Sequence, residues 1–122
     1  MKIAFLGDIA LIGKYDITIN SHCKERLKVM AEKLNEFDYV VANLESPLTE
    51  KTKSWVCKSM HLRTPVVNVE LLNYLNVNAV SIANNHIYDF GQKGLEETIA
   101  VLESNSIEWF GADAKHLIKE IN

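Results

Sequence analysis

The sequence is poor in cysteine and in long apolar runs. Its two cysteines, Cys23 and Cys57, lack the Cys-x-x-Cys spacing of a redox or zinc site, so both are predicted to be ordinary packing residues. No stretch approaches the roughly 18 apolar residues of a membrane span. The apolar start, Ile3–Leu6, is also too short for the core of an export signal. These absences predict a cytoplasmic protein without a membrane span.

Positive charge is also scarce, because 13 Lys and Arg residues face 16 Asp and Glu residues and the net charge is −3. The cations are scattered along the chain, which gives no electrostatic reason to expect a nucleic-acid partner. The 122 residues, of which 48% are hydrophobic, are typical of a globular protein. A chain of this length is predicted to form a single domain over residues 1–122.

Short apolar runs alternate with helical patterns. The runs resemble strands covered on both faces, and they are Ile3–Leu6, Tyr39–Ala42, Ala79–Ala83 and Ile107–Phe110. The predicted helices are Ser21–Phe37 with Ser21 as N-cap, a helix starting at Thr64-Pro65, one from Gln92 to Asn105, and one opening at Asp113. This alternation predicts an α/β fold with right-handed crossovers and a mainly parallel sheet.

The segment Ser46–Arg63 is the least regular part of the sequence. It is polar over Thr49–Lys53, where charged and hydroxyl side chains follow one another. We interpret it as a solvated connection, and a mobile flap is the alternative.

Polar residues follow each predicted strand directly. The four exits read Gly7-Asp8, Asn43-Leu44-Glu45, Asn84-Asn85-His86 and Gly111-Ala112-Asp113. Because the carboxyl ends of parallel strands meet at one edge of a sheet, these groups are expected to converge there. Two carboxylates, amide oxygens and an imidazole form a mixed ligand set that suits Mn²⁺, Fe, Zn²⁺ or Mg²⁺. A divalent cation would also relieve the repulsion between neighbouring carboxylates. The sequence therefore predicts a metal site at this edge.

Each of these residues also has a structural interpretation. Asp8 is compatible with a turn or a helix cap, and Asn43 and Asn84 are natural turn formers. Asp89 is compatible with a cap on the third helix, and His86 with a histidine whose hydrogen bonds are satisfied inside the fold. The functional interpretation depends on three separate strand exits carrying the same chemistry.

The same residues resemble the bacterial capsule-synthesis protein CapA family. This is the poly-γ-glutamate synthesis group within the calcineurin-like metallophosphoesterase superfamily. The similar segments, in order, are Gly7-Asp8, Asn43–Thr49, Leu62–Pro65, and Ala83–His86 with Asp89, Gly91 and Gly94. The resemblance covers nearly all of this chain and concerns the N-terminal part of such proteins.

The resemblance implies one half of a four-layer fold, in which two packed sheets are flanked by helices and a two-metal centre lies on one edge. Asp8 matches the first metal-ligand aspartate, Glu45 the carboxylate that bridges the metals, and Asn85 the metal-binding asparagine. His86 matches the histidine that protonates a leaving group or stabilises the charge of the transition state. The hydrolysis of a phosphate ester, or of an amide, by metal-activated water is the implied chemistry.

Three further residues complete the predicted site. Asn43 is an additional candidate metal ligand, Asp89 the nearest residue able to orient His86, and Arg63 a candidate clamp for a substrate phosphate or carboxylate. The sequence departs from the superfamily at Ala10, where a histidine is usual, and at Ile87, where an acidic residue is usual. The later histidine motifs are absent. The prediction is therefore half of a dinuclear site, completed by a C-terminal half or a partner chain.

Two alternatives remain open. One is a non-catalytic component of the capsule machinery that uses this edge to bind a partner or an anionic polymer. The other is a plain α/β fragment whose apolar sheet face is uncovered and which self-associates. Most CapA-like proteins work at the cell envelope, so the resemblance leaves an association with the envelope open.

Overall fold

The computed structural model describes residues 1–113 and 115–121 of the chain. Its elements are β1 (Ile3–Ile9), η1 (Gly13–Tyr15), α1 (Cys23–Leu34), β2 (Tyr39–Leu44), η2 (Val66–Asn68), α2 (Val69–Tyr74), β3 (Ala79–Ser81), α3 (Gly91–Ser104) and β4 (Glu108–Phe110). All pairings between neighbouring strands are parallel. The predicted α/β fold with a parallel sheet is confirmed.

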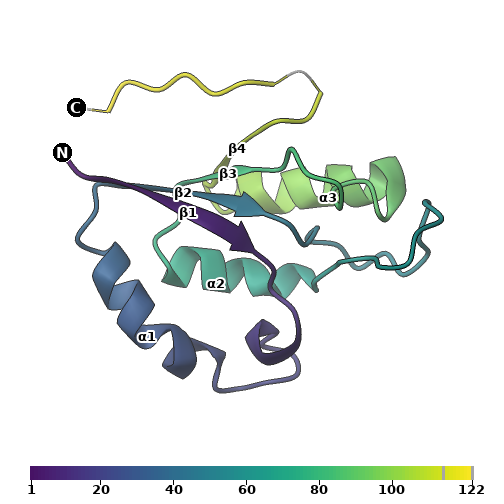
Figure 1. Cartoon of the computed structure of the whole chain (residues 1–122), viewed down its shortest axis with the longest axis horizontal. Helices are drawn as coiled ribbons and strands as arrows, with labels where there is room; N and C mark the ends of the chain where they lie inside the picture. Colours follow the sequence, from purple (N-terminus) through teal and green to yellow (C-terminus); the bar gives the residue numbers. More distant parts are fainter. Residues whose placement is uncertain (114, 122) are drawn as a thin grey trace.

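The strands follow one another across the sheet in the order β1-β2-β3-β4. Each crossover therefore moves one strand further in the same direction, and α1, α2 and α3 lie on the same face of the sheet (Figure 1). All four strands point toward the same end of the molecule, where the segment that follows β2 also lies (Figure 1).

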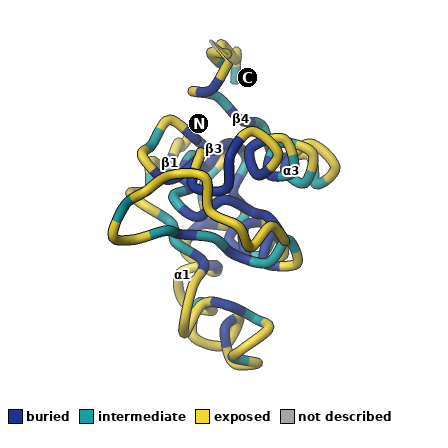
Figure 2. The backbone as a smooth tube through the Cα atoms, turned by 90° about the vertical axis from the view of Figure 1, so that its right-hand side faces the viewer, coloured by how far each residue is buried: buried dark blue, intermediate teal, exposed yellow. Residues whose placement is uncertain are grey.

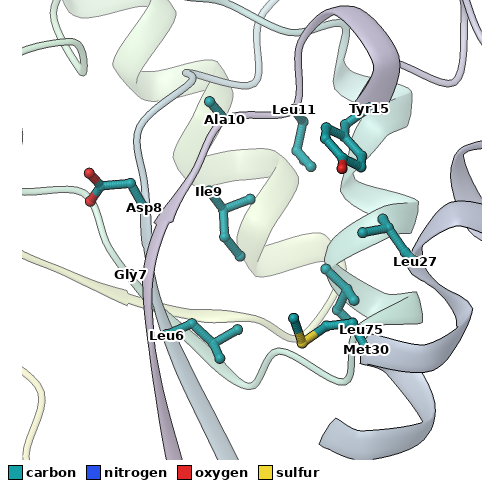
Figure 3. A pocket seen from close by; sticks show the side chains of 10 residues that line it. All are labelled: Leu6, Gly7, Asp8, Ile9, Ala10, Leu11, Tyr15, Leu27, Met30 and Leu75. Carbon is teal, nitrogen blue, oxygen red and sulfur yellow. The ribbon is translucent and has the colours of Figure 1, made fainter.

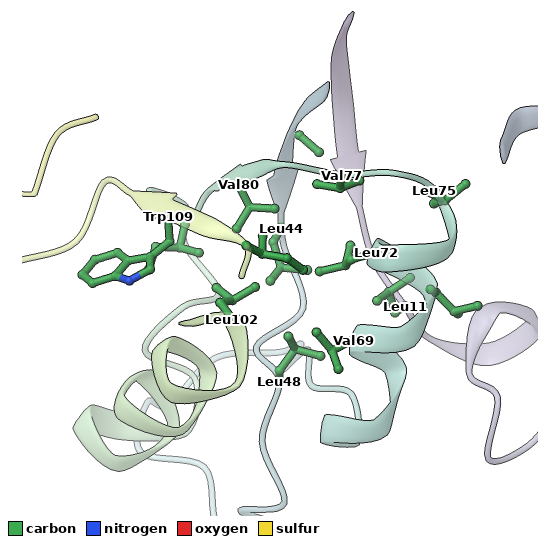
Figure 4. Close-up of a cluster of buried hydrophobic side chains, with 14 of the residues drawn as sticks. Leu11, Leu44, Leu48, Val69, Leu72, Leu75, Val77, Val80, Leu102 and Trp109 are labelled. Atoms are coloured by element: carbon green, nitrogen blue, oxygen red, sulfur yellow. The ribbon is translucent and has the colours of Figure 1, made fainter. Parts of the chain in front are cut away.

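The hydrophobic core lies between the sheet and these helices. The strands contribute Val40, Leu44 and Val80, which are fully buried. The helices contribute Leu72 and Leu102, also fully buried, so the core is continuous from α2 to α3 (Figure 4). The alternation of buried and less buried residues along β2 matches a strand that packs helices on one face only.

The opposite face of the sheet has little cover at β1. Phe5 is 78% exposed and Ile3 is 37% exposed, whereas their partners on β2 are the half-buried Val41 and the buried Tyr39. The C-terminal segment approaches this face through Lys119, which pairs with Glu108 at 2.6 Å. An apolar strand surface is thus left open beside the segment.

Two predicted helix starts are wrong in detail. Ser21 does not cap α1, because the N-cap residue is His22 and no side chain caps the first turn. Thr64 does not cap the second helix either, since its backbone is engaged in a bridge with Leu48. Pro65 keeps an extended backbone with ψ of 142°, and a 3-10 turn (η2) precedes α2. The third helix matches its prediction to within one residue at each end.

The final predicted helix, opening at Asp113, is wrong for all its described residues. Residues 115–121 have no regular structure, and Asp113 has a φ of 50°, which no right-handed helix contains. A helix this short is marginal in water unless packing supports it. Instead, Lys115 lies 3.9 Å from the centre of the Trp109 ring. Ala114, which the prediction included, lies outside the described residues.

The connection between β2 and η2 is only partly solvated. Ser46, Leu48 and Thr49 are buried, whereas residues 50–57 are exposed (Figure 2, in which this end of the molecule faces the viewer). The prediction that both cysteines are packing residues is confirmed for Cys23, which is buried, and is wrong for Cys57, which is exposed. Among the described residues, no helix is both long and apolar enough to cross a bilayer.

Candidate functional site

Asp8 lies within β1 and Asn43 within β2, near the ends of these strands and not beyond them as the sequence predicted. The register shifts by one residue between Phe5 and Asp8, so three steps along β1 correspond to two along β2. Side chains alternate between the faces of a strand, and such a bulge therefore turns the following side chain to the other face. Asp8 consequently shares the open face of the sheet with Asn43, its partner on β2.

A row of hydrogen-bonded side chains crosses three strand ends. The Asn43 amide Nδ2 donates to Asp8 Oδ1 at 2.7 Å, and the Asn84 Nδ2 donates to Asn43 Oδ1 at 3.2 Å. Asn84 Nδ2 also donates to the Leu44 carbonyl at 2.8 Å. The structure thus brings together Asp8, Asn43 and Asn84, three residues from separate strand exits. We call them the exit row.

Glu45 and Asn85 lie next to the exit row in the chain. The Glu45 backbone N–H donates to the Ile9 carbonyl at 2.9 Å, which holds the residue beside the end of β1. In the described part of the chain, no donor contacts the Glu45 carboxylate, which belongs to a half-buried residue, or the side chain of the exposed Asn85. Both side chains are therefore available for a ligand.

A tight turn after β3 fixes His86 against Asp89. The His86 N–H donates to Asn84 Oδ1 at 3.1 Å, and the Asp89 N–H donates to the His86 carbonyl at 3.0 Å. His86 Nδ1 then lies 2.8 Å from Asp89 Oδ2. The Lys58 ammonium, which can only donate, lies 3.2 Å from the same Nδ1. The shorter contact with the carboxylate, which only accepts hydrogen bonds, favours a proton on Nδ1 and leaves Nε2 as the free ring nitrogen. The Asp89 carboxylate therefore faces His86 and does not cap α3.

Lys58 is a residue of this site that the sequence did not reveal. Its ammonium donates to the Asn85 carbonyl at 2.7 Å and pairs with Asp89 Oδ1. Asp89 Oδ2 also accepts the Leu62 N–H at 2.8 Å, so the fully buried carboxylate joins the loop to the turn. A lysine in a polar loop has no pattern that would have identified it. Only the folded loop places it against Asp89.

Burial of the Asp89 carboxyl works to raise its pKa. Hydrogen bonds from Lys58, His86 and the Leu62 amide, together with the charge of the ammonium, outweigh this effect and hold the pKa below its ordinary value. Asp89 is therefore ionised near neutral pH.

Arg63 and Asp113 make no contact with the exit row. The Arg63 guanidinium donates to the Thr49 carbonyl at 3.2 Å. Burial works to raise the pKa of Asp16, but hydrogen bonds from Asn68 and Thr18, together with the charge of Arg63, hold it below its ordinary value. Asp113, at the fourth strand exit, is exposed. The structure therefore unites three of the four predicted exits.

A metal ion would find only part of a coordination shell among these residues. Within residues 1–113 and 115–121, no three His, Cys, Asp or Glu side chains are grouped closely enough to hold a metal. The donors at the edge are the carboxylates of Asp8 and Glu45 and the amide oxygens of Asn43, Asn84 and Asn85. Oxygen ligands of this kind suit a hard divalent cation, with water or other chains filling the remaining positions.

A cavity of about 340 Å³ lies on the helix side of β1. Its lining is mainly apolar and includes Leu6, Ile9, Leu27 and Met30. The Asp8 carboxylate points away from these side chains (Figure 3). The bulge in β1 thus separates the apolar cavity from the polar edge.

Comparison with known proteins relates the sequence of this chain to one family. The family model described as bacterial capsule synthesis protein PGA_cap matches residues 2–119. The PGA biosynthesis protein CapA of Bacillus subtilis is 28% identical over 115 residues, which cover 92% of this chain and 30% of that protein. The capsule biosynthesis protein CapA of Bacillus anthracis is 28% identical over 127 residues, covering 97% and 31%.

A shorter match is closer in identity. A protein of Mycobacterium tuberculosis named as a probable polyglutamine synthesis accessory protein is 36% identical over 77 residues, which cover 63% of this chain and 20% of that protein. The chain therefore spans less than a third of the length of each of these relatives.

Proposed function

Because the chain belongs to the bacterial capsule synthesis protein family PGA_cap, we propose that it serves capsule or poly-glutamate synthesis as part of a metal-dependent hydrolase of the phosphoesterase type. The observation that carries the proposal is the exit row, in which Asp8, Asn43 and Asn84 meet beside Glu45. These residues, with Asn85, would hold part of a metal centre. The cation, when bound, would polarise a substrate oxygen and lower the pKa of coordinated water.

His86 and Asp89 supply the acid–base part of the proposal. Asp89 accepts the Nδ1–H of His86 and so fixes both the tautomer and the plane of the ring. In the neutral ring Nε2 would accept a proton, and once the ring is doubly protonated Nε2 would donate that proton to a departing oxygen. Lys58 assists by holding Asp89 ionised and by tying the Asn85 carbonyl to the loop. Arg63 is the candidate clamp for an anionic substrate.

Titration of the purified chain with Mn²⁺ tests the proposal directly. We expect binding observed by electron paramagnetic resonance to weaken at least tenfold in Asp8→Asn and in Glu45→Gln, because each substitution removes one of two carboxylate ligands. Glu96→Gln, at an exposed carboxylate on α3, is the matched control and should leave the affinity unchanged. No detectable Mn²⁺ binding, with no effect of Asp8→Asn, would favour a non-catalytic role.

Turnover of an aryl phosphate gives a second measurement. With an incomplete shell, we expect the chain alone to hydrolyse the ester slowly or not at all. Robust turnover that Glu45→Ala abolishes would establish a complete centre and contradict the half-site proposal.

We also propose that a second copy of the chain, or a chain that completes the site, covers the open sheet face. Phe5 is 78% exposed on this face. We expect the chain to elute ahead of the monomer position in sizing chromatography at high concentration, and Phe5→Glu to return it to that position. Val29→Glu is the control, since Val29 is equally exposed but lies on α1. A monomer at every concentration would contradict cover by a second copy and leave only a different chain as the occupant.

A further inference from the structure

A separate cavity, of about 250 Å³, lies where the exposed part of the loop meets the first turn of α3. Three lysines from two segments line it, Lys51 and Lys53 from the loop and Lys93 from the helix. The rest of the wall consists of Glu50, Thr52, Trp55 and Phe90. None of these residues belongs to the exit row. We call this cavity the lysine groove.

The carboxylates around the lysine groove are engaged elsewhere. Glu50 Oε1 accepts the Val66 N–H at 2.8 Å. Glu97 Oε2 accepts the Thr49 hydroxyl and the Glu50 N–H. Among the described residues, no carboxylate pairs with the ammonium of Lys51, Lys53 or Lys93. The three cations in this cavity thus lack the carboxylate partner that Lys24, Lys28, Lys33, Lys58 and Lys119 have.

Two further features favour an anion at this place. The first turn of α3 contains no acidic residue, so Lys93 adds to the positive end of the helix dipole. Trp55 is 73% exposed, and its ring lies against the α-carbon of Gly91, where an added Cβ would come within 2.8 Å. The ring is therefore held beside the cations with apolar surface open to a ligand.

We propose that the lysine groove binds a linear chain of carboxylates, such as an acidic peptide or a glutamate polymer. Ammonium groups on flexible stems contact single carboxylates without demanding a fixed spacing. The exposed ring of Trp55 packs against the methylene groups between the charges. The whole chain carries a net charge of −3, so a polyanion that covers a broad surface gains little electrostatic attraction. A short flexible segment that contacts only the groove is therefore the preferred ligand.

The choice of polymer rests on the proposed role in capsule or poly-glutamate synthesis, whereas the groove itself requires no metal. Binding should therefore be measured in EDTA at low salt. The probes are decaglutamate with α-linkages and decaglutamate with γ-linkages. Chemical-shift changes of the Trp55 indole and of the Lys51, Lys53 and Lys93 amides report the site.

Matched triple variants separate the groove from net charge. Lys51→Gln/Lys53→Gln/Lys93→Gln removes three positive charges at the groove, and Lys24→Gln/Lys28→Gln/Lys33→Gln removes three from α1. We expect at least tenfold weaker binding in the first and less than a twofold change in the second. Lys93→Glu alone should weaken binding by an intermediate factor. Dispersed amide spectra verify that each variant is folded.

Several results would overturn the assignment. They are equal weakening in both triple variants, no binding of either peptide, and equally tight binding of a ten-nucleotide single strand at the same residues. Similar affinity for the two linkages indicates recognition of any carboxylate chain, and preference for one identifies the linkage. Glu45→Gln should leave peptide binding unchanged, so failure of the metal proposal and failure of the groove give different results.

Discussion

Replacing Asp89 with alanine is expected to lower the free energy of unfolding by about 3 to 5 kcal/mol. The carboxylate is fully buried and joins Lys58, the His86 ring and the Leu62 amide. Its removal leaves a partly buried ammonium and a buried N–H without their acceptor, and both losses are costly. Urea unfolding at pH 7, followed by circular dichroism, measures the difference.

The pH dependence of this difference has a definite sign. Because the pKa of Asp89 is lowered in the folded chain, its contribution to stability is complete above the unfolded-state value of about 3.9. The contribution is lost as the pH falls through the lower folded-state pKa. The gap between the parent chain and Asp89→Ala should therefore be constant near neutral pH and shrink in acid.

Two variants serve as controls for Asp89. Glu96→Ala removes an exposed carboxylate from α3 and should change the stability by less than about 0.5 kcal/mol. In a double-mutant cycle, Lys58→Met should cost much less in the Asp89→Ala background than in the parent chain, since the pair is already broken. Additive effects of the two substitutions would contradict the contact between them.

Gly111→Ala is expected to lower the free energy of unfolding by about 2 to 4 kcal/mol. Gly111 has a φ of +95°, which strains any residue with a Cβ. A Cβ would also lie 2.6 Å from the Ala83 Cβ and 3.0 Å from the Ala83 nitrogen. The substitution would push apart β4 and the chain just before Asn84, so Mn²⁺ affinity at the exit row should fall as well.

Gly13→Ala separates strain from contact. Gly13 also has a positive φ, of +57°, but an added Cβ there meets no atom within 4 Å. Its substitution should cost about 1 kcal/mol, the effect of backbone strain alone. If both substitutions lower the free energy of unfolding by the same amount in thermal or urea experiments, the close approach of Gly111 to Ala83 does not contribute to the effect of Gly111→Ala.

The strands were predictable because each is a short apolar run bounded by polar residues. Buried parallel strands have this pattern regardless of their neighbours, and the runs at Tyr39–Ala42 and Ala79–Ala83 became β2 and β3. The final helix was not predictable in the same way. Leu117, Ile118 and Ile121 have helical spacing, but the described segment lies against Trp109 and Glu108 instead. Long-range contacts decided its conformation.

The candidate site was predictable in part for the same reason. The convergence of Asp8, Asn43 and Asn84 follows from parallel strands ending at one edge. The bulge in β1 could not be predicted in this way, because it exists only in the pairing of β1 with β2. This bulge determines the face of the sheet to which Asp8 turns. Lys58 likewise reaches Asp89 only through the path of an irregular loop, for which local sequence carries no rule.

The order of the strands has a consequence for how the chain is made. Each strand pairs with the one synthesised just before it, and each intervening helix covers the same face. A ribosome-bound chain can thus add one strand–helix unit at a time without rearranging what has already assembled. The residues of the exit row would then come together only when β3 and its following turn have emerged, so ligand binding at this row requires three strand units to be in place.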